Sequence, residues 1–391
     1  MKDKVAIIGM GCAKFGERWE CGLEDLMIEA AQECFADAGI GTDEIEAVFY
    51  GNCKDGTGAS LAVVDTLKLK NAASYHNDNF CCSGHMALIE GAMAVASGAY
   101  NTVLVMGAEK LKDAGFGGLG VGRGATPVME ARRTAPGSFG LIGTNYFQKY
   151  GLTYEEGRTM LARIAVKNHA NGYLTPRAHF HKQITVEDAL NAPIIAAPLG
   201  LYDCCGVSDG AACAIITRAD QARNYRDDPI YVKGFGVSTD TILPHYRPGF
   251  DWVSFPALVN SSRRAYQMAG ITNPREELSL AEVHDCFTCT ELAIYEDFDL
   301  CDRGAANRCL EEGYFNIGGK MPVNTDGGLK CFGHPVGASG IRMTYEVYKQ
   351  LQGKVDNPKR QLKDISHYGL SHTFGGPPQV SAVFIVGNEL G

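Results

Sequence analysis

Hydrophobic and polar positions follow two periods along this chain, and the periods recur in a fixed order. Short apolar runs predict buried strands, and apolar residues at every third or fourth position predict helices. The first third of the chain contains predicted strands and helices in alternation: Val5–Ile8, Leu23–Ala38, Ala47–Gly51, Ser60–Leu69, His85–Gly98 and Val103–Gly107. Glycines follow several of these strands, as in layered α/β folds.

The same order of elements returns in the second half of the chain. The predicted strands and helices there are Ile230–Gly234, Pro256–Gly270, Leu278–Val283, Thr288–Phe298, Gly337–Leu351, Ile365–Gly369 and Val380–Val386. We interpret this as an internal duplication, with one half at 1–225 and the other at 226–391. Two fused copies of one α/β unit place equivalent helix N-termini face to face. The helix start that follows Cys81 is therefore expected to meet the helix start that follows His334.

A long insertion interrupts the first half at about 111–197. It contains the predicted helices Asn145–Tyr150 and Thr153–Asn171, and the strand Ala211–Thr217 follows it. The glycine-rich run Gly115–Gly124 has neither the spacing nor the lysine of a phosphate-binding loop. Insertions of this length usually form a lid, a substrate wall or an interface.

Composition narrows the class of protein. Hydrophobic residues make up 45% of the chain and charged residues 21%, which is enough for a large core, and the net charge of −9 argues against nucleic-acid binding. No apolar run reaches the length of a membrane span, and the N-terminus does not resemble a signal peptide. The fourteen cysteines are scattered, as in proteins of a reducing cytoplasm, where we expect this one.

One cysteine stands at the start of a predicted helix. In Asn77-Asp78-Asn79-Phe80-Cys81-Cys82-Ser83-Gly84, the first cysteine precedes the helical run by a few residues. The free N–H groups and the dipole of a helix N-terminus favour a thiolate there. We interpret Cys81 as a nucleophile and Cys82 as a packed neighbour, although either could be a core cysteine.

Three further segments carry partners for such a nucleophile. His334 lies in a glycine-rich helix start and could take the thiol proton. His284 and Cys286 follow a strand at its carboxyl end, where ligands bind in α/β sheets. Gly376 belongs to a Gly-Gly turn whose N–H groups suit an oxyanion hole. Taken singly, each histidine would more often be structural.

The four segments together resemble the thiolase superfamily. Asn79-x-Cys81-x-x-Gly84, His284-Asp285-Cys286-Phe287, Gly333-His334-Pro335 and Gly375-Gly376 occur in the order of that family and span the chain. The His-Asp-Cys-Phe element is similar to that of sterol-carrier-protein-type thiolases and their bacterial and archaeal relatives. In common thiolases a cysteine stands near the C-terminus where this chain has Thr373. The resemblance implies that Cys286 takes over the role of that cysteine.

The resemblance also implies a fold and a reaction. The fold is α/β, with two duplicated βαβαβαββ halves that form a five-layered αβαβα core and a loop-domain insertion in the first half. The reaction is cleavage of a 3-oxoacyl-CoA by CoA, or the reverse Claisen condensation, through an acyl group on Cys81. His334 activates Cys81, Cys286 moves the proton, and His284 holds the enolate oxygen. The N–H groups of Cys81 and Gly376 form the oxyanion hole, and no metal or tightly bound cofactor is expected.

Substrate and partners follow less directly. Acetoacetyl-CoA is the default substrate, and a bulkier or aromatic 3-oxoacyl-CoA such as benzoylsuccinyl-CoA is the alternative. Relatives with these motifs imply a homodimer, with a small zinc-ribbon and OB-fold protein as a further partner. No nucleic acid or membrane is expected as a partner.

Other interpretations remain open at this point. A non-catalytic thiolase-like scaffold would have the same fold, and a decarboxylating ketoacyl synthase would have a Cys-His-His or Cys-His-Asn set. Cys286-x-x-Cys289 matches a metal or redox spacing, but no second pair accompanies it. Cys204 and Cys205 are expected to serve packing and a turn.

Overall fold

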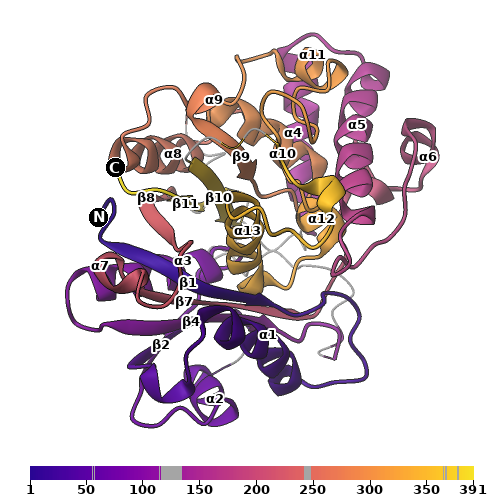
Figure 1. The fold of residues 1–391 in the computed structure, drawn as a ribbon. Coiled ribbons are helices and arrows are strands. Elements are labelled where there is room, and N and C mark those ends of the chain that lie inside the picture. The colour runs from indigo at the N-terminus through magenta and orange to yellow at the C-terminus, as the bar shows by residue number, and fades with distance from the viewer. Residues whose placement is uncertain are drawn as a thin grey trace.

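Helices and strands alternate along most of the chain (Figure 1). The computed structural model describes residues 1–54, 56, 58–113, 115, 134–241, 248–363, 365, 368–376 and 378–391. The strands are β1 (Val5–Cys12), β2 (Ala47–Gly51), β3 (Ala73–Asn77), β4 (Thr102–Glu109), β5 (Ile194–Ala196), β6 (Leu199–Gly200), β7 (Gly210–Arg218), β8 (Ile230–Thr239), β9 (Leu278–Glu282), β10 (Tyr368–Gly375) and β11 (Val380–Gly387). The helices are α1 (Leu23–Ala38), α2 (Ala59–Thr66), α3 (Ser83–Ala96), α4 (Ala135–Lys149), α5 (Tyr154–Tyr173), α6 (Val186–Asn191), α7 (Ala219–Ala222), α8 (Pro256–Ala269), α9 (Pro274–Glu277), α10 (Thr288–Asp297), α11 (Ala306–Glu311), α12 (Gly328–Phe332) and α13 (Val336–Leu351), with 3-10 turns η1 (Thr42–Glu44), η3 (Leu201–Asp203) and η5 (Pro358–Arg360).

One mixed sheet runs through the described part of the molecule in the order β3-β2-β4-β7-β1-β8-β11-β10-β9. The two halves have mirrored strand orders about the junction of β1 and β8, which pair through Ala6–Tyr231 and Ile7–Ile230. Among the described residues, the first half contributes five strands to this sheet, whereas in the second half the third strand is reduced to a single bridge between Ala281 and Val323. This topology agrees with the predicted duplication, while the boundary at 225/226 stays a prediction.

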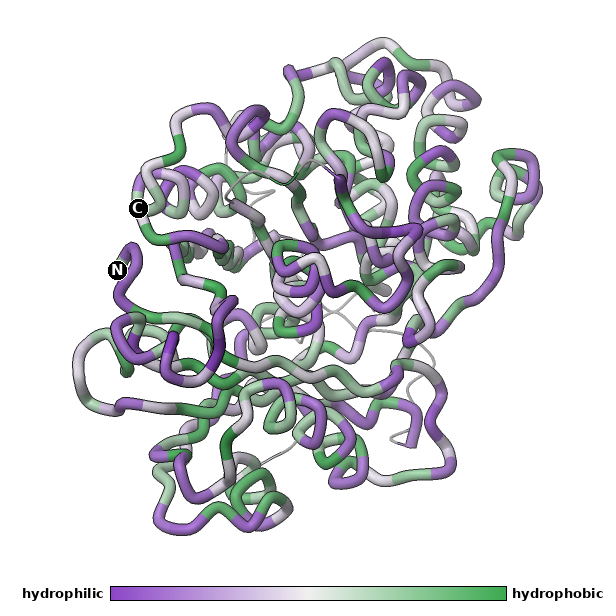
Figure 2. Tube along the Cα trace, viewed as in Figure 1, coloured by the Kyte–Doolittle hydropathy of each residue, from purple (hydrophilic) through white to green (hydrophobic). Residues whose placement is uncertain are grey.

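The two halves of the sheet lie on opposite sides of a central pair of helices, and further helices cover their outer faces. The molecule therefore has five layers. Helices α3 and α13 lie together in the middle and contact strands of both halves. Helices α1 and α2 cover the outer face of the first half, and α8 covers that of the second, with α10 packed beside α8 and against α4 and α5 of the insertion (Figure 1). Side chains along β1 alternate between two cores: Val5 and Ile7 pack with the middle helices, and Ala6 and Ile8 pack with α1. Because both faces of β1, β4 and β7 are buried, these strands are largely apolar, as the green tube in the sheet of Figure 2 shows.

The predicted elements differ from the structure mainly in three places. The strand expected at Ile365–Gly369 is β10 at Tyr368–Gly375, because Ser371 to Gly375 pair with β11 instead of forming a turn. The sequence pattern did not indicate β3, because this edge strand has only one buried residue, Asn77. Helix α4 begins ten residues before the expected Asn145, since the Thr134 side chain caps it by accepting from the Gly137 N–H at 3.2 Å. Most of the run 115–124 lies outside the described residues.

The insertion between β4 and β7 packs on the second half. Lys167 of α5 forms a buried ion pair with Glu291 of α10, with Nζ and Oε1 2.8 Å apart. Asn168 donates from Nδ2 to Asp285 Oδ2 at 2.7 Å. The insertion therefore supports the segment that carries His284 and Cys286. Among the described residues, no helix has the length and apolar character needed to cross a lipid bilayer.

Candidate active site

Cys81 lies in a constrained loop between β3 and α3. The preceding residue, Phe80, has a φ of 53°, which costs about 1–3 kcal/mol for a bulky side chain. The Ser83 hydroxyl holds the loop: it accepts from the Asn79 N–H at 2.9 Å and donates to the Phe80 carbonyl at 2.6 Å. Cys82 is fully buried, with its Sγ 3.1 Å from the Thr373 carbonyl oxygen, whereas Cys81 is half-buried. The two adjacent thiols thus point into different surroundings.

Glycines allow the N-termini of α3 and α13 to touch. A Cβ on Gly84 would lie 2.5 Å from the Gly337 carbonyl oxygen, and one on Gly107 would lie 2.3 Å from the same atom. A Cβ on Gly337 would lie 2.4 Å from the Gly51 carbonyl oxygen. No larger residue fits at these positions without moving backbone, so the motif glycines set the separation of the two helices. The duplication predicted that the helix starts after Cys81 and after His334 would meet, and in the structure they are in contact.

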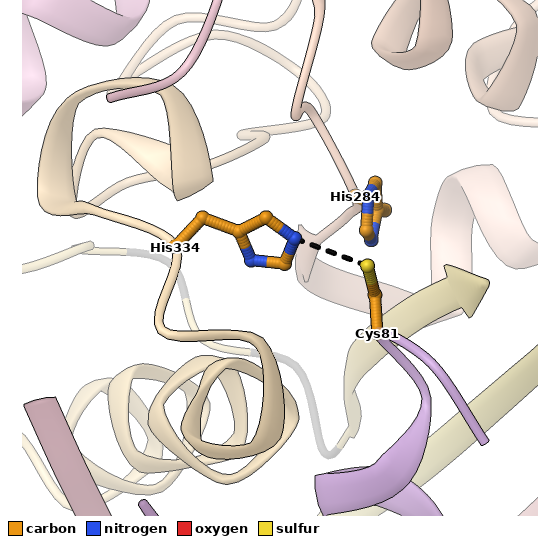
Figure 3. Close-up of side chains that lie close together, drawn as sticks. All are labelled: Cys81, His284 and His334. Atoms are coloured by element: carbon orange, nitrogen blue, oxygen red, sulfur yellow. Dashed lines mark hydrogen bonds between the residues drawn. The ribbon is translucent and has the colours of Figure 1, made fainter. Parts of the chain in front are cut away.

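His334 faces Cys81 across this contact, with Nε2 3.2 Å from Sγ (Figure 3). Its other nitrogen, Nδ1, is 2.7 Å from the Ser339 hydroxyl, which in turn donates to the Pro335 carbonyl at 2.9 Å. Because the hydroxyl proton is used there, Ser339 accepts from Nδ1–H. The Nε2 lone pair is therefore free to accept the Cys81 thiol proton.

His284 presents a hydrogen-bond donor to the same point. Its Nδ1 accepts from the Phe374 N–H at 3.4 Å, so the proton is on Nε2. That Nε2 is buried and has no hydrogen-bond partner among the described residues. The rings of His284 and His334 are nearly perpendicular, with centroids 5.2 Å apart (Figure 3). A buried donor without a partner normally indicates the place of a ligand atom.

The sulfur of Cys81 and the nearest nitrogens of the two histidines lie within 4.8 Å of one another. Cysteine and histidine are zinc ligands, but a ligating histidine must offer a lone pair. In this structure the lone pair on Nδ1 of His284 accepts from the Phe374 N–H. The other ring nitrogen, Nε2, therefore carries the proton and directs an N–H group at the cluster. The arrangement suits proton transfer and oxyanion binding better than metal binding.

Burial sets the charge state of these groups. It lowers the pKa of His334 to about 3, with a further contribution from Arg342, and it lowers the pKa of His284 well below its ordinary value. Burial, with the neighbouring thiols of Cys82 and Cys205, raises the pKa of Cys81 well above its ordinary value. The resting pair is therefore a neutral thiol and a neutral imidazole. The expected helix-start stabilisation of a thiolate is outweighed by desolvation.

Cys286 is 3% exposed and lies on the segment after β9. Burial raises its pKa well above the ordinary value, and Cys205 and Cys81 are its next largest influences. The adjacent Asp285 anchors this segment, since its carboxylate accepts from the Leu329 N–H at 2.6 Å and from Asn168. The sequence pattern did not single out Asn168 or Ser339, although a serine in the first turn of the His334 helix was a visible signal.

Gly375, the last residue of β10, lies against the loop that carries Cys81. A Cβ on Gly375 would be 2.7 Å from the Phe80 Cβ and 2.9 Å from the Asn79 carbonyl oxygen. Gly376 follows with a φ of 67°, which favours glycine. Thr373 stands on β10 where its hydroxyl bonds to His85 Nδ1 at 2.7 Å, so it serves a buried network.

Two family models match most of the chain. The model described as "Thiolase, N-terminal domain" covers residues 5–220, and "Thiolase C-terminal domain-like" covers residues 245–388. The chain belongs to the thiolase family. Its sterol-carrier-protein type, expected from the His284–Phe287 motif, is confirmed by the relatives.

Three curated relatives show the range of this group. An acetyl-CoA acetyltransferase of Methanothermobacter thermautotrophicus is 36% identical over 98% of this chain and 99% of its own. Sterol carrier protein 2 of Bos taurus is 28% identical over 96% of this chain and 70% of its own. The benzoylsuccinyl-CoA thiolase subunit BbsB of Thauera aromatica is 27% identical over 96% of both chains.

A solved structure shows the same fold. The "Ltp2-ChsH2(DUF35) aldolase" chain superposes with a TM-score of 0.83 over 99% of this thiolase and 98% of its own length, at 22% identity. The thiolase described here is thus an acyltransferase by its relatives and has the thiolase fold by its structure.

Proposed function

We propose that this thiolase cleaves a 3-oxoacyl-CoA with CoA, or forms it by Claisen condensation, through an acyl group on Cys81. The observation that carries the proposal is the unpartnered Nε2–H of His284 beside the hydrogen-bonded pair of Cys81 and His334. That arrangement offers a nucleophile, a base and an oxyanion donor to one substrate.

The first half-reaction uses the histidines. His334 Nε2 takes the thiol proton as the Cys81 sulfur bonds to the keto carbon of the substrate. The N–H groups of Cys81 and Gly376 stabilise the oxygen that becomes negative. When the carbon–carbon bond breaks, the electron pair passes to an enolate of the leaving acyl-CoA. The Nε2–H of His284 donates to its oxygen, and the Cys286 thiol protonates its carbon.

The second half-reaction transfers the acyl group. The Cys286 thiolate takes the proton of the CoA thiol, and the CoA sulfur bonds to the acyl carbon. The Cys81 sulfur leaves and recovers its proton from His334. CoA is a co-substrate in this scheme, and the chain needs no other cofactor for these steps.

The relatives support a short or a bulky acyl group. We propose acetoacetyl-CoA as substrate, from the 36% identical acetyl-CoA acetyltransferase, with benzoylsuccinyl-CoA as the alternative from the Thauera relative. Phe139 of α4 packs on Phe287 and Phe374, with ring centroids 5.0 and 5.8 Å apart, so the insertion borders the segments that carry Cys286 and Gly376. The insertion is thus suited to select the acyl group.

We also propose a homodimer. Strand β3 is the outer strand of the sheet, and Tyr75 on it is 44% exposed, so a second copy could pair along this edge. A small OB-fold and zinc-ribbon partner is the further proposal. It is supported by the similar solved structure, in which the thiolase-fold chain belongs to an aldolase named with a DUF35 protein. The free thiols of all fourteen cysteines fit the reducing cytoplasm proposed as its location.

The decisive experiment compares adjacent cysteines. We expect Cys81→Ala to lose acetoacetyl-CoA thiolysis by at least about 10⁴-fold, as for other removed nucleophiles, while Cys82→Ala retains the acyl-enzyme in a labelling assay. Cys286→Ser should lose turnover but still allow alkylation of Cys81. Full thiolysis by Cys81→Ala would contradict the mechanism, and a folded wild-type protein without turnover on a panel of 3-oxoacyl-CoAs would favour the scaffold interpretation.

A further inference from the structure

A second cysteine pair lies beside the proposed acid/base thiol. The segment that contains Cys204 and Cys205 runs antiparallel to the segment that contains Cys286 and Phe287. Cys204 and Phe287 form an antiparallel bridge, and the Cys205 N–H donates to the Cys286 carbonyl at 2.9 Å. These contacts join two parts of the chain that the sequence separates by about eighty residues.

The residues next to this bridge are Cys205 and Cys286, and the Cys205 N–H···O=C Cys286 bond joins their backbones directly. In an antiparallel pair, the residues next to a bridge on each strand face one another and project their side chains to the same side. Cys205 and Cys286 share one of the two hydrogen bonds of such a pair, whose Cα atoms are about 5.5 Å apart. A disulfide needs Cα atoms about 4.4–6.8 Å apart, so these two cysteines meet its backbone requirement.

The neighbouring cysteines are directed elsewhere. Cys204 is one residue out of register with Cys286, and its Sγ contacts the Gly200 carbonyl at 3.4 Å. The Sγ of Cys289 contacts the Phe139 carbonyl at 3.3 Å, on the side of α4. Cys205 is half-buried whereas Cys286 is 3% exposed, so Cys205 is the more accessible of the two to an oxidant from solvent. The Cys205 thiol also raises the pKa of Cys286 and that of Cys81, as a group close to both does.

We propose that Cys205 and Cys286 form a reversible disulfide when the protein meets a disulfide oxidant such as oxidised glutathione. The Cys205 thiolate attacks one glutathione sulfur, and one glutathione thiolate leaves. The Cys286 thiolate then attacks the Cys205 sulfur of this mixed disulfide, and the second glutathione leaves. Two protein thiols lose two protons and two electrons, and oxidised glutathione is reduced to two molecules of glutathione.

This disulfide would remove the proton carrier of the reaction. Its effect on turnover rests on the proposed function, in which the Cys286 thiol donates and accepts the proton. A covalent Cys286 sulfur cannot do so, and loss of a general acid and base slows a reaction by about 10²–10⁴-fold. The bond would also shield Cys286 from irreversible oxidation beyond the sulfenic state.

The test combines peptide mapping with turnover. The full-length protein is incubated with oxidised glutathione at pH 8.5 and alkylated with iodoacetamide. It is then digested with trypsin without reduction. We expect a disulfide-linked pair of peptides, 183–218 with 276–303, in which fragmentation assigns Cys205 and Cys286. Turnover should fall by about 10²-fold with formation of this pair and return with dithiothreitol.

Matched variants decide between this pair and its neighbours. Cys205→Ser should abolish the linked peptides, whereas Cys204→Ser should leave them, each compared with its own untreated sample. A link from peptide 71–110 to peptide 276–303 would overturn the inference, because Cys81 would then be the partner of Cys286. Loss of activity on treatment with oxidised glutathione without any disulfide-linked peptides would also overturn the inference. A mapped Cys205–Cys286 disulfide with unchanged turnover would keep the pairing and refute the proposed role of Cys286 instead.

Discussion

The contact between Gly84 and Gly337 predicts the effect of one added methyl group. In Gly84→Ala the new Cβ would stand 2.5 Å from the Gly337 carbonyl oxygen, roughly 1 Å inside ordinary van der Waals contact. The obstacle is backbone at the start of a fully packed helix, so it cannot rotate away as a side chain would. Alanine is otherwise favourable within a helix, and any loss must come from this clash.

The expected magnitude follows from the separation of the reacting groups. Relief of the clash moves α3 and α13 apart by about 1 Å, which lengthens the 3.2 Å contact between Cys81 Sγ and His334 Nε2 to about 4 Å. A displacement of about 1 Å between reacting groups costs about 10²-fold in rate. Overpacking should also lower the free energy of unfolding by about 1–3 kcal/mol.

The assay is steady-state thiolysis of acetoacetyl-CoA together with the rate of Cys81 alkylation by iodoacetamide at fixed pH. Gly91→Ala is the matched control, because Gly91 is on the same helix as Gly84 but away from the site. Its new Cβ would lie 2.9 Å from Cγ2 of Val105 on β4. We expect both variants to lose stability and only Gly84→Ala to lose about 10²-fold in kcat. Equal kcat values for the two variants would refute the reasoning.

Three more predictions test the site and its support. Ser339→Ala should lower kcat by about 10-fold or more with little change in KM and should leave His334 free to take either tautomer, which nitrogen NMR of the imidazole would show. Burial lowers the pKa of His334 and of His85 to about 3, so the unfolded chain binds more protons below pH 6.5 and stability should fall between pH 6.5 and 3 by about 1.4 kcal/mol per unit for each histidine. His85→Gln should make that decline shallower in urea titrations, and an unchanged slope would contradict it. Lys167→Met leaves Glu291 buried without its cation and should lower the free energy of unfolding by about 3–5 kcal/mol. A loss below about 1 kcal/mol would show that this ion pair does not stabilise the fold.

Local signals were enough to predict the centre of the site. The cysteine and the histidine each precede a helix by two residues, and glycines that permit close approach follow both. The repeated order of strands and helices then indicated that Cys81 and His334 meet, because two copies of one unit bring equivalent positions together. The outer parts of the site depend on details that no single segment contains.

What the sequence did not reveal depends on non-local contacts. The donor state of His284 follows from the Phe374 N–H, ninety residues further along the chain. Cys205 lies beside Cys286 because of an isolated bridge between Cys204 and Phe287. The pattern of apolar residues does not predict such a bridge. The edge strand β3 was missed for the opposite reason, because its side chains are largely exposed and hydrogen bonds to β2 alone hold it in the sheet.

The placement of Cys81 and His334 shows why the site needs two halves in one chain. Both residues stand two positions before the first residue of α3 or α13, and Gly84 and Gly337 both stand three positions further on. They occupy equivalent places in the two halves. Two identical half-length chains would carry the same residue at both helix starts, and neither two thiols nor two imidazoles supply a nucleophile with its base. A single chain with two halves can carry a thiol at one start and an imidazole at the other, which is the asymmetry that the proposed mechanism requires.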